Sequence, residues 1–189
     1  MCRLCLWMLI CVAGGHAWTS AIAFSFDARR RGDGVDIVAV AELRADVDEA
    51  WRVLTAYERY ADFVPDVTLS RVVQRDGLAL VLELNGALRI LWWRLPLAVR
   101  LAISEMPPFE VRARLIEGTL REMHGRYVLA PRPGGARLTY HGRIVPESGL
   151  RGLLDAWIVR RSASRQFGAL VDEIERLAAP AAGVPGAVR

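Results

Sequence analysis

The most regular pattern in the chain is a run of apolar residues at steps of three and four between residues 150 and 177. This spacing places them on one side of a helix of 3.6 residues per turn, with charged residues mostly on the other side. The expected apolar side holds Leu150, Leu153, Leu154, Trp157, Ser164, Phe167, Val171, Ile174 and Leu177. Because Arg161, Ser164 and Gly168 replace bulky side chains near its middle, we expect space between the helix and the surface that it covers.

Upstream of this helix the hydrophobic period changes to two, which predicts strands. One strand is expected at residues 35–43. Two short helices should follow it, and Asp46 and Glu49 have the spacing of a capping box at the start of the first. Six further strands are predicted at residues 67–75, 78–89, 95–105, 109–117, 120–130 and 137–145. Short turns join these strands, so neighbours in the chain should pair antiparallel.

This order predicts an α+β domain in which a curved antiparallel sheet of about seven strands wraps around one long C-terminal helix. Only that helix, of about 28 residues and roughly 42 Å, is long enough to cover the sheet. We assign the domain to residues 35–178, after a flexible lead-in at residues 24–34 and before a disordered tail at residues 179–189. A space between sheet and helix must be filled by side chains or by a ligand.

The run Trp-x-x-Leu-Thr-x-Tyr-x-x-Tyr-x-x-Phe-x-Pro from Trp51 to Pro65 is one of several recognisable motifs. Together with residues 117–120, residues 125–127 and the closing helix, it resembles the START-like helix-grip superfamily. The polyketide cyclase/dehydrase and coenzyme-Q-binding groups are the most similar members, and the similarity spans residues 35–177. The resemblance implies a hydrophobic cavity under the last helix that holds a lipid, a quinone or a polycyclic molecule.

Alternation along the strands indicates which side chains face this helix. The expected ligand contacts are Leu82, Leu84, Val111, Leu115, Met123, Tyr127, Tyr140, Trp157, Arg161 and Ser164. Arg161 would either pair with a carboxylate or headgroup, or extend to the surface. The motif residues Trp51, Tyr57, Tyr60 and Phe63 are expected to pack the short helices against the sheet. A register error of one residue would turn each strand's choice to the opposite face.

Few residues have the pattern of a catalytic or metal site. His124 and His141 are the only histidines after residue 23, and they alternate out of phase with the expected cavity residues, so we place them on the outer face. The sequence has no nucleophile elbow, phosphate-binding glycine loop or metal-ligand pattern, and we predict neither metal nor cofactor. Glu83 and Asn85 interrupt an apolar strand and would either face solvent or orient the polar end of a ligand.

The first 23 residues predict export. Arg3 precedes an apolar run, and Ala21-Ile22-Ala23 matches a small-x-small cleavage site, so we expect a secretory signal peptide cut after Ala23. The alternative is an uncleaved membrane anchor, but about ten apolar residues span roughly 15 Å of a hydrocarbon layer of about 30 Å. All three cysteines lie in this segment, so the processed chain would have no thiol. A periplasmic or secreted protein is therefore expected.

The charge balance and the apolar content bear on which classes of partner the sequence favours. Removing Arg3 leaves 24 of the 25 basic residues against 21 acidic ones, a net charge of +3 that is too even to indicate nucleic-acid binding. The resemblance implies a hydrophobic small molecule as the partner, and the 53% hydrophobic content suits a domain that its core alone must hold.

Three classes of function agree with these features. A non-catalytic carrier of a hydrophobic small molecule needs an apolar cavity with few polar groups. A cyclase or dehydratase acting on a polyketide-like substrate needs an acid/base pair in the cavity. A protein-interaction module would fill the cavity with its own side chains. The missing acid/base pattern favours the carrier, and so does the expected export, because familiar members of the resembled groups work inside the cell.

Residues 90–97 are unusually apolar for a hairpin turn. Trp92 and Trp93 lie at their centre, with Arg89 and Arg94 on either side. Either the two strands continue through this stretch and bury it, or it forms an exposed rim that contacts a membrane or a protein partner.

If residues 90–97 form a membrane-contacting rim, replacing both Trp92 and Trp93 with Ser should weaken binding to liposomes, because indole rings favour the headgroup layer. The melting temperature should change little. Liposome co-sedimentation and a thermal melt of the same preparation measure the two effects. A large loss of thermal stability would instead show that both side chains belong to the core.

Overall fold

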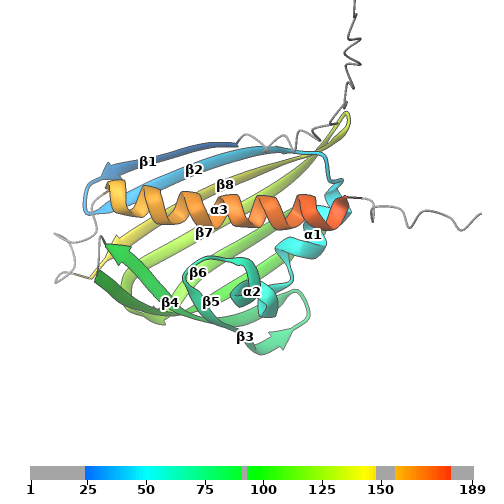
Figure 1. The fold of residues 1–189 in the computed structure, drawn as a ribbon. Helices are drawn as coiled ribbons and strands as arrows, with labels where there is room; N and C mark the ends of the chain where they lie inside the picture. The colour runs from blue at the N-terminus through cyan, green and yellow to red at the C-terminus, as the bar shows by residue number, and fades with distance from the viewer. Residues whose placement is uncertain (1–23, 91–92, 148–155, 180–189) are drawn as a thin grey trace, which may run out of the picture.

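The computed structural model describes residues 24–90, 93–147 and 156–179. One antiparallel sheet, in the order β1-β2-β8-β7-β6-β5-β4-β3, curves around a single long helix (Figure 1). The elements are β1 (Phe24–Arg31), β2 (Gly34–Leu43), α1 (Val47–Leu54), the 3₁₀ turn η1 (Tyr57–Arg59), α2 (Tyr60–Phe63), β3 (Val67–Asp76), β4 (Ala79–Ile90), β5 (Trp93–Met106), β6 (Glu110–Gly118), β7 (Leu120–Arg132), β8 (Gly135–Pro146) and α3 (Ala156–Ala178).

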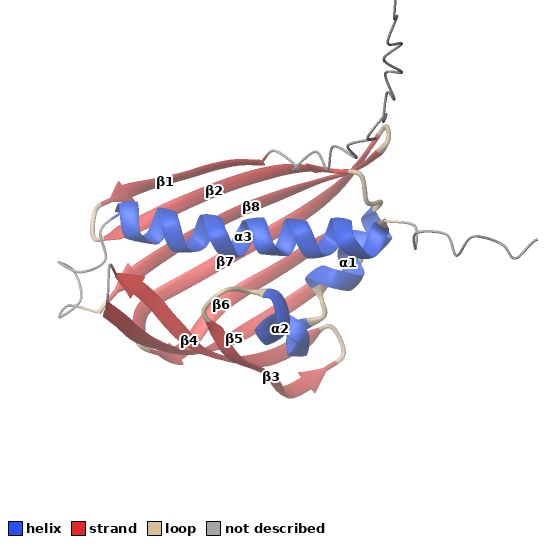
Figure 2. Ribbon diagram, viewed as in Figure 1, coloured by secondary structure: helices blue, strands red, loops and turns tan. Residues whose placement is uncertain are grey.

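The hydrophobic core lies between the concave face of the sheet and α3 (Figure 2). Alternation along each strand explains this, because every second residue faces the helix. Among the largest fully buried side chains are Ile37, Leu43, Leu82, Leu138 and Ile174. No helix in the described part of the chain is long and apolar enough to cross a membrane.

The expected capping box forms at the start of α1. The Asp46 carboxylate accepts a hydrogen bond from the Glu49 backbone N–H at 2.8 Å, and the Glu49 carboxylate accepts one from the Asp46 N–H at 2.9 Å. These bonds satisfy two of the N–H groups that a helix start leaves free. The helix buries Ala50, Val53 and Leu54 against the core.

A carboxylate near the end of α3 fixes this helix to the corner between β2 and α1. Glu175 accepts hydrogen bonds from the backbone N–H groups of Arg44 at 2.6 Å and Ala45 at 3.3 Å. Its second oxygen accepts one from Arg44 Nε at 2.9 Å. Since Ala45 is fully buried, these contacts hold α3 to backbone that water does not reach.

Two further ion pairs hold α3 to the segment that contains η1 and α2. Glu173 accepts hydrogen bonds from Arg176 at 2.7 Å and from Arg59 at 3.1 Å, and the pKa of its carboxyl is lowered, mainly by Arg176. Arg165 donates to Asp66 at 2.6 Å, just before β3. The Asp66 side chain is almost fully buried, so this contact closes the gap between α3 and the α2–β3 connection.

The sequence predicted the α+β class, the antiparallel order and the closing helix, and the structure confirms all three. It has eight strands instead of about seven, because residues 24–31 form β1 where we expected a flexible lead-in. Phe24 and Phe26 alternate with polar residues along β1, and their rings lie 5.4 and 6.4 Å from that of Phe167. This alternation is short and a run of arginines follows it, so the sequence did not indicate a strand here.

Some expectations fall on residues that the structure does not describe. These are the signal peptide, nearly all of the predicted tail, and the start of the long helix before residue 156. They stay predictions.

Replacing Glu175 with Ala should lower the free energy of unfolding by about 2 kcal/mol, because the N–H groups of Arg44 and Ala45, the latter buried, lose their acceptor. Urea denaturation monitored by circular dichroism measures the change. Asp172→Ala is the matched control, since Asp172 is an exposed carboxylate on the same helix. Equal effects of the two substitutions would contradict the anchoring role of Glu175.

Candidate ligand-binding cavity

A cavity of about 170 Å³ lies between the concave face of the sheet and α3. Strand residues form its floor, α3 covers it, and the segment that contains η1 and α2 contributes one wall. Its described lining is apolar apart from four tyrosines and Gln166. The lining residues are Phe26, Ile37, Tyr57, Tyr60, Val64, Val67, Leu82, Leu84, Leu101, Ile103, Val111, Ala113, Met123, Gly125, Tyr127, Tyr140, Ile144, Ala163, Gln166, Phe167 and Leu170.

The space exists because small residues lie side by side on three neighbouring strands. Ala113 of β6 pairs with Gly125 of β7, which pairs with Gly142 of β8. Inward-facing residues along such a row usually fill the gap between a sheet and its covering helix. Here one methyl group and two hydrogen atoms take their place, so the floor is low at Ala113, while the end of the Tyr140 side chain covers the two glycines.

A row of larger residues borders this low floor. Val111 pairs with Tyr127, and Tyr127 pairs with Tyr140. The two tyrosine rings are 4.5 Å apart between centroids and tilted by 34°. The Tyr140 side chain leans over the neighbouring glycines: a Cβ atom on Gly142 would overlap its hydroxyl group, and one on Gly125 would lie 2.9 Å from it. The glycines therefore make room for the end of this side chain.

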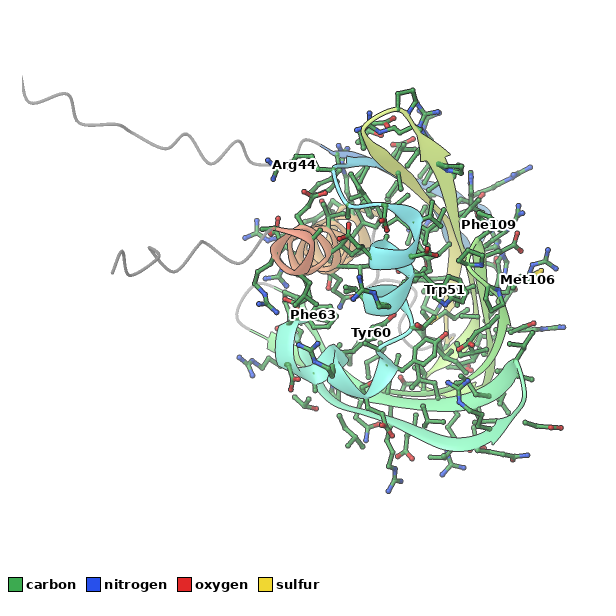
Figure 3. The ribbon with its side chains drawn as sticks, turned by 90° about the vertical axis from the view of Figure 1, so that its right-hand side faces the viewer. Arg44, Trp51, Tyr60, Phe63, Met106 and Phe109 are labelled. Carbon is green, nitrogen blue, oxygen red and sulfur yellow. The ribbon has the colours of Figure 1, made fainter. Side chains whose placement is uncertain are left out.

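All four tyrosines of the chain line the cavity. The Tyr60 hydroxyl donates to the Leu54 carbonyl at 2.6 Å, and Figure 3 shows Tyr60 on the side of the molecule where α1 and α2 lie. The Tyr57 hydroxyl is buried and has no hydrogen-bond partner among the described residues. The polar groups of this cavity are thus phenols in an apolar setting.

Burial raises the pKa of each of these phenols. It raises the pKa of Tyr140 to about 12 and the pKa of Tyr60 further. The pKa of Tyr57 is raised by burial and then by the nearby Glu105 carboxylate, and that of Tyr127 by burial and then by Tyr140. All four hydroxyls therefore stay protonated at neutral pH and can donate hydrogen bonds.

The structure places six of the predicted ligand contacts around the cavity: Leu82, Leu84, Val111, Met123, Tyr127 and Tyr140. The alternation of the strands was therefore read in the correct register. Leu115 packs against the core but is not among the lining residues. Ala113, two residues earlier on the same strand, lines the cavity instead.

The structure does not place the expected helix contacts at the cavity. Trp157 is 51% exposed, Arg161 is exposed and Ser164 is half-buried, and none of them lines the cavity. The helix instead presents Ala163, Gln166, Phe167 and Leu170 to the cavity.

Gly168 of α3 makes room for a strand rather than a ligand. A Cβ atom on Gly168 would lie 3.2 Å from the ring of Phe24 in β1. Because β1 was not predicted, the thinned side of the helix was assigned to the cavity.

The other candidate residues lie away from the cavity. His124 and His141 are exposed on the outer face, as predicted. Glu83 faces the same side and pairs with Arg71 at 2.9 Å, so solvent, rather than a ligand, is its environment. Asn85 shares that orientation. The described residues contain no group of His, Cys, Asp and Glu that could hold a metal ion.

The apolar hairpin is described only in part. Trp92 lies outside the described residues, and Trp93 begins β5, where its backbone pairs with Ile90. The rim hypothesis for this hairpin stays a prediction.

Sequence reasoning missed several residues of the site. Tyr57 and Tyr60 were assigned to packing, although a tyrosine every three residues after a capped helix is a usable signal for one shared face. Gln166 lay one residue before an expected core position. Gly125 has no side chain and Ala113 has only a methyl group, and only the pairing of the strands brings them together.

A curved antiparallel sheet, one covering helix and a largely apolar cavity between them define a fold class that binds hydrophobic ligands. A family model for polyketide cyclases/dehydrases and lipid transport proteins matches residues 43–170. The chain belongs to this family. No curated protein matches the chain.

Solved structures with the same fold include enzymes and lipid transfer proteins. The Zhui aromatase/cyclase from Streptomyces sp. R1128 has a TM-score of 0.64 and 18% identity, over 84% of this chain and 100% of that one. The di-domain ARO/CYC StfQ from the steffimycin biosynthetic pathway has a TM-score of 0.64 and 14% identity, over 77% of this chain and 50% of its own. A STAR-related lipid transfer protein from Xanthomonas axonopodis has a TM-score of 0.56 and 13% identity, over 82% and 98%.

An alkaline titration should show no tyrosinate absorbance near pH 10, where an unfolded chain ionises. The folded-state pKa values are raised, so the stability contributed by the buried phenols is complete below about pH 10 and is lost as the pH rises above that. Ultraviolet difference spectra with and without urea measure this, and circular dichroism reports unfolding. Tyrosinate formation near pH 10 in the folded protein would contradict the burial of the tyrosines.

Proposed function

We propose that this protein binds a hydrophobic small molecule in the cavity beneath α3 and carries it without changing it chemically. The apolar lining of the cavity is the observation that carries this proposal. Membership of a family that includes lipid transport proteins supports it. Burying an apolar ligand against this lining contributes about 25 cal/mol per Å² of apolar surface removed from water.

The size of the cavity limits the part of the ligand that it can enclose. Its volume is about 170 Å³, close to that of an engineered cavity of about 150 Å³ that holds one benzene molecule. Pockets for drug-sized ligands measure roughly 300–1,000 Å³. The cavity as it stands therefore accepts one ring or a short chain, and a larger ligand requires its walls to move.

The alternative function is that of a cyclase or dehydratase, which needs a base in the cavity to accept a proton. The titratable side chains among the described lining residues are the four tyrosines. Because their pKa values are raised, they are protonated at neutral pH and act as hydrogen-bond donors. This chemistry supports ligand binding over proton abstraction.

The substitution Ala113→Phe should abolish ligand retention, because its ring would fill the low floor of the cavity. Ala102→Phe is the matched control: it makes the same chemical change at an exposed position on β5, on the opposite face of the sheet. Native mass spectrometry of the purified protein, followed by organic extraction, identifies any molecule that stays bound.

The wild-type protein and Ala102→Phe should retain a stoichiometric hydrophobic molecule, and Ala113→Phe should give the mass of the bare chain. If the wild-type protein also gives a bare mass after incubation with quinones and phospholipids, the carrier function is wrong. A protein-interaction role with a self-filled cavity would then be the better description.

A further inference from the structure

We propose that Tyr140 recognises the polar end of the ligand, and that the cavity selects an uncharged, largely apolar molecule with an oxygen acceptor at this end. This inference rests on the proposed binding function and names the ligand chemistry of the same site. It follows from where the Tyr140 hydroxyl lies and from what surrounds it.

The Tyr140 hydroxyl is directed into the cavity. The residue is 8% exposed, and its hydroxyl lies over Gly125 and Gly142. Gly125 itself lines the cavity. No group in the described part of the chain completes a hydrogen bond with this hydroxyl, whereas the Tyr60 hydroxyl has its acceptor at Leu54. Unlike the Tyr57 hydroxyl, the Tyr140 hydroxyl is not closed off from the cavity, so it can donate a hydrogen bond to a ligand oxygen there.

The surrounding residues give the ligand an orientation. Tyr127 stacks beside Tyr140, and Tyr57, whose buried hydroxyl also has no described partner, lines the same cavity. On the other side of the glycine row, the paired residues Met123 and Ile144 are apolar. The oxygen of the ligand therefore lies at the tyrosine row, and its hydrocarbon part lies toward Met123.

The lining of the cavity selects an uncharged molecule. The end of the Tyr140 side chain lies over Gly125 and Gly142, so the low part of the floor is at Ala113. A ligand ring in the cavity can contact the rings of Tyr127 and Tyr140, as aromatic pairs do. Because no lining side chain in the described residues carries a charge at neutral pH, a charged group would lose its hydration without gaining a counter-ion.

Two probes of nearly the same size test the recognition of oxygen. Acetophenone and α-methylstyrene differ only in a C=O group against a C=CH₂ group. The wild-type protein should bind acetophenone more tightly, and Tyr140→Phe should weaken acetophenone binding about fivefold to tenfold, the value of one hydrogen bond. Its affinity for α-methylstyrene should stay unchanged, since the ring and its contact with Tyr127 remain. Isothermal titration calorimetry measures all four affinities.

Tyr60→Phe is the matched control, because it also removes one cavity phenol but breaks a bond to Leu54 rather than to the ligand. It should change both affinities by the same factor. A second measurement needs no variant: the infrared carbonyl stretch of bound acetophenone should lie below its value in hexane, as expected for a hydrogen-bonded carbonyl.

The outcomes separate the two proposals. If the wild-type protein binds both probes equally and the carbonyl stretch matches that in hexane, the cavity binds ligands but Tyr140 does not recognise oxygen. If Tyr140→Phe weakens both probes equally, Tyr140 acts through packing alone and the inference is again wrong. If neither probe binds the wild-type protein, the binding function itself fails for ring-sized molecules.

Discussion

The structure depends on one helix covering the concave side of one curved sheet. Each inward-facing strand residue would otherwise meet water, so α3 must stay in place for the core to exist. The hydrogen bonds from the Arg44 and Ala45 backbone to Glu175 hold the end of the helix where β2 turns into α1. The ion pair between Arg165 and Asp66 holds its middle to the opposite edge of the sheet. The helix is thus fixed on both sides of the cavity that it covers.

The cavity is a consequence of this arrangement. A helix fixed at its sides cannot sink into a low part of the floor, so the small side chain of Ala113 leaves space beneath it, whereas the end of the Tyr140 side chain fills the space above Gly125 and Gly142. Cavities of this kind lower stability because the surrounding side chains lose packing contacts. The protein also buries the Tyr57 hydroxyl without a partner in its described residues. Both features act against stability, and both are suited to holding a ligand.

The sequence predicted the sheet well because the strands have a simple period. Leu82, Leu84, Val111, Met123, Tyr127 and Tyr140 follow strict alternation, and the structure places all of them around the cavity. The side of α3 that faces the cavity was harder to predict, because the rotation of a helix about its own axis depends on the elements that pack against each side. Gly168 was expected to leave space for a ligand, but the ring of Phe24 in β1 lies against it. The row of small residues could not be predicted from the sequence alone, since strand register, rather than sequence spacing, brings Gly125 beside Gly142.

The distribution of charge explains how such a cavity can select ligands. On the outer face of the sheet, carboxylates pair with guanidinium groups, as Glu110 does with Arg126, whose bond lowers the pKa of the Glu110 carboxyl. The described lining of the cavity, by contrast, has phenols that burial keeps neutral. Ion pairing therefore has little part in recognition there, and the difference between ligands comes from shape and from a few directional hydrogen bonds. In a low-dielectric setting such bonds are strong when made and costly when missing, so one hydroxyl, that of Tyr140, can distinguish molecules that the apolar walls would accept equally.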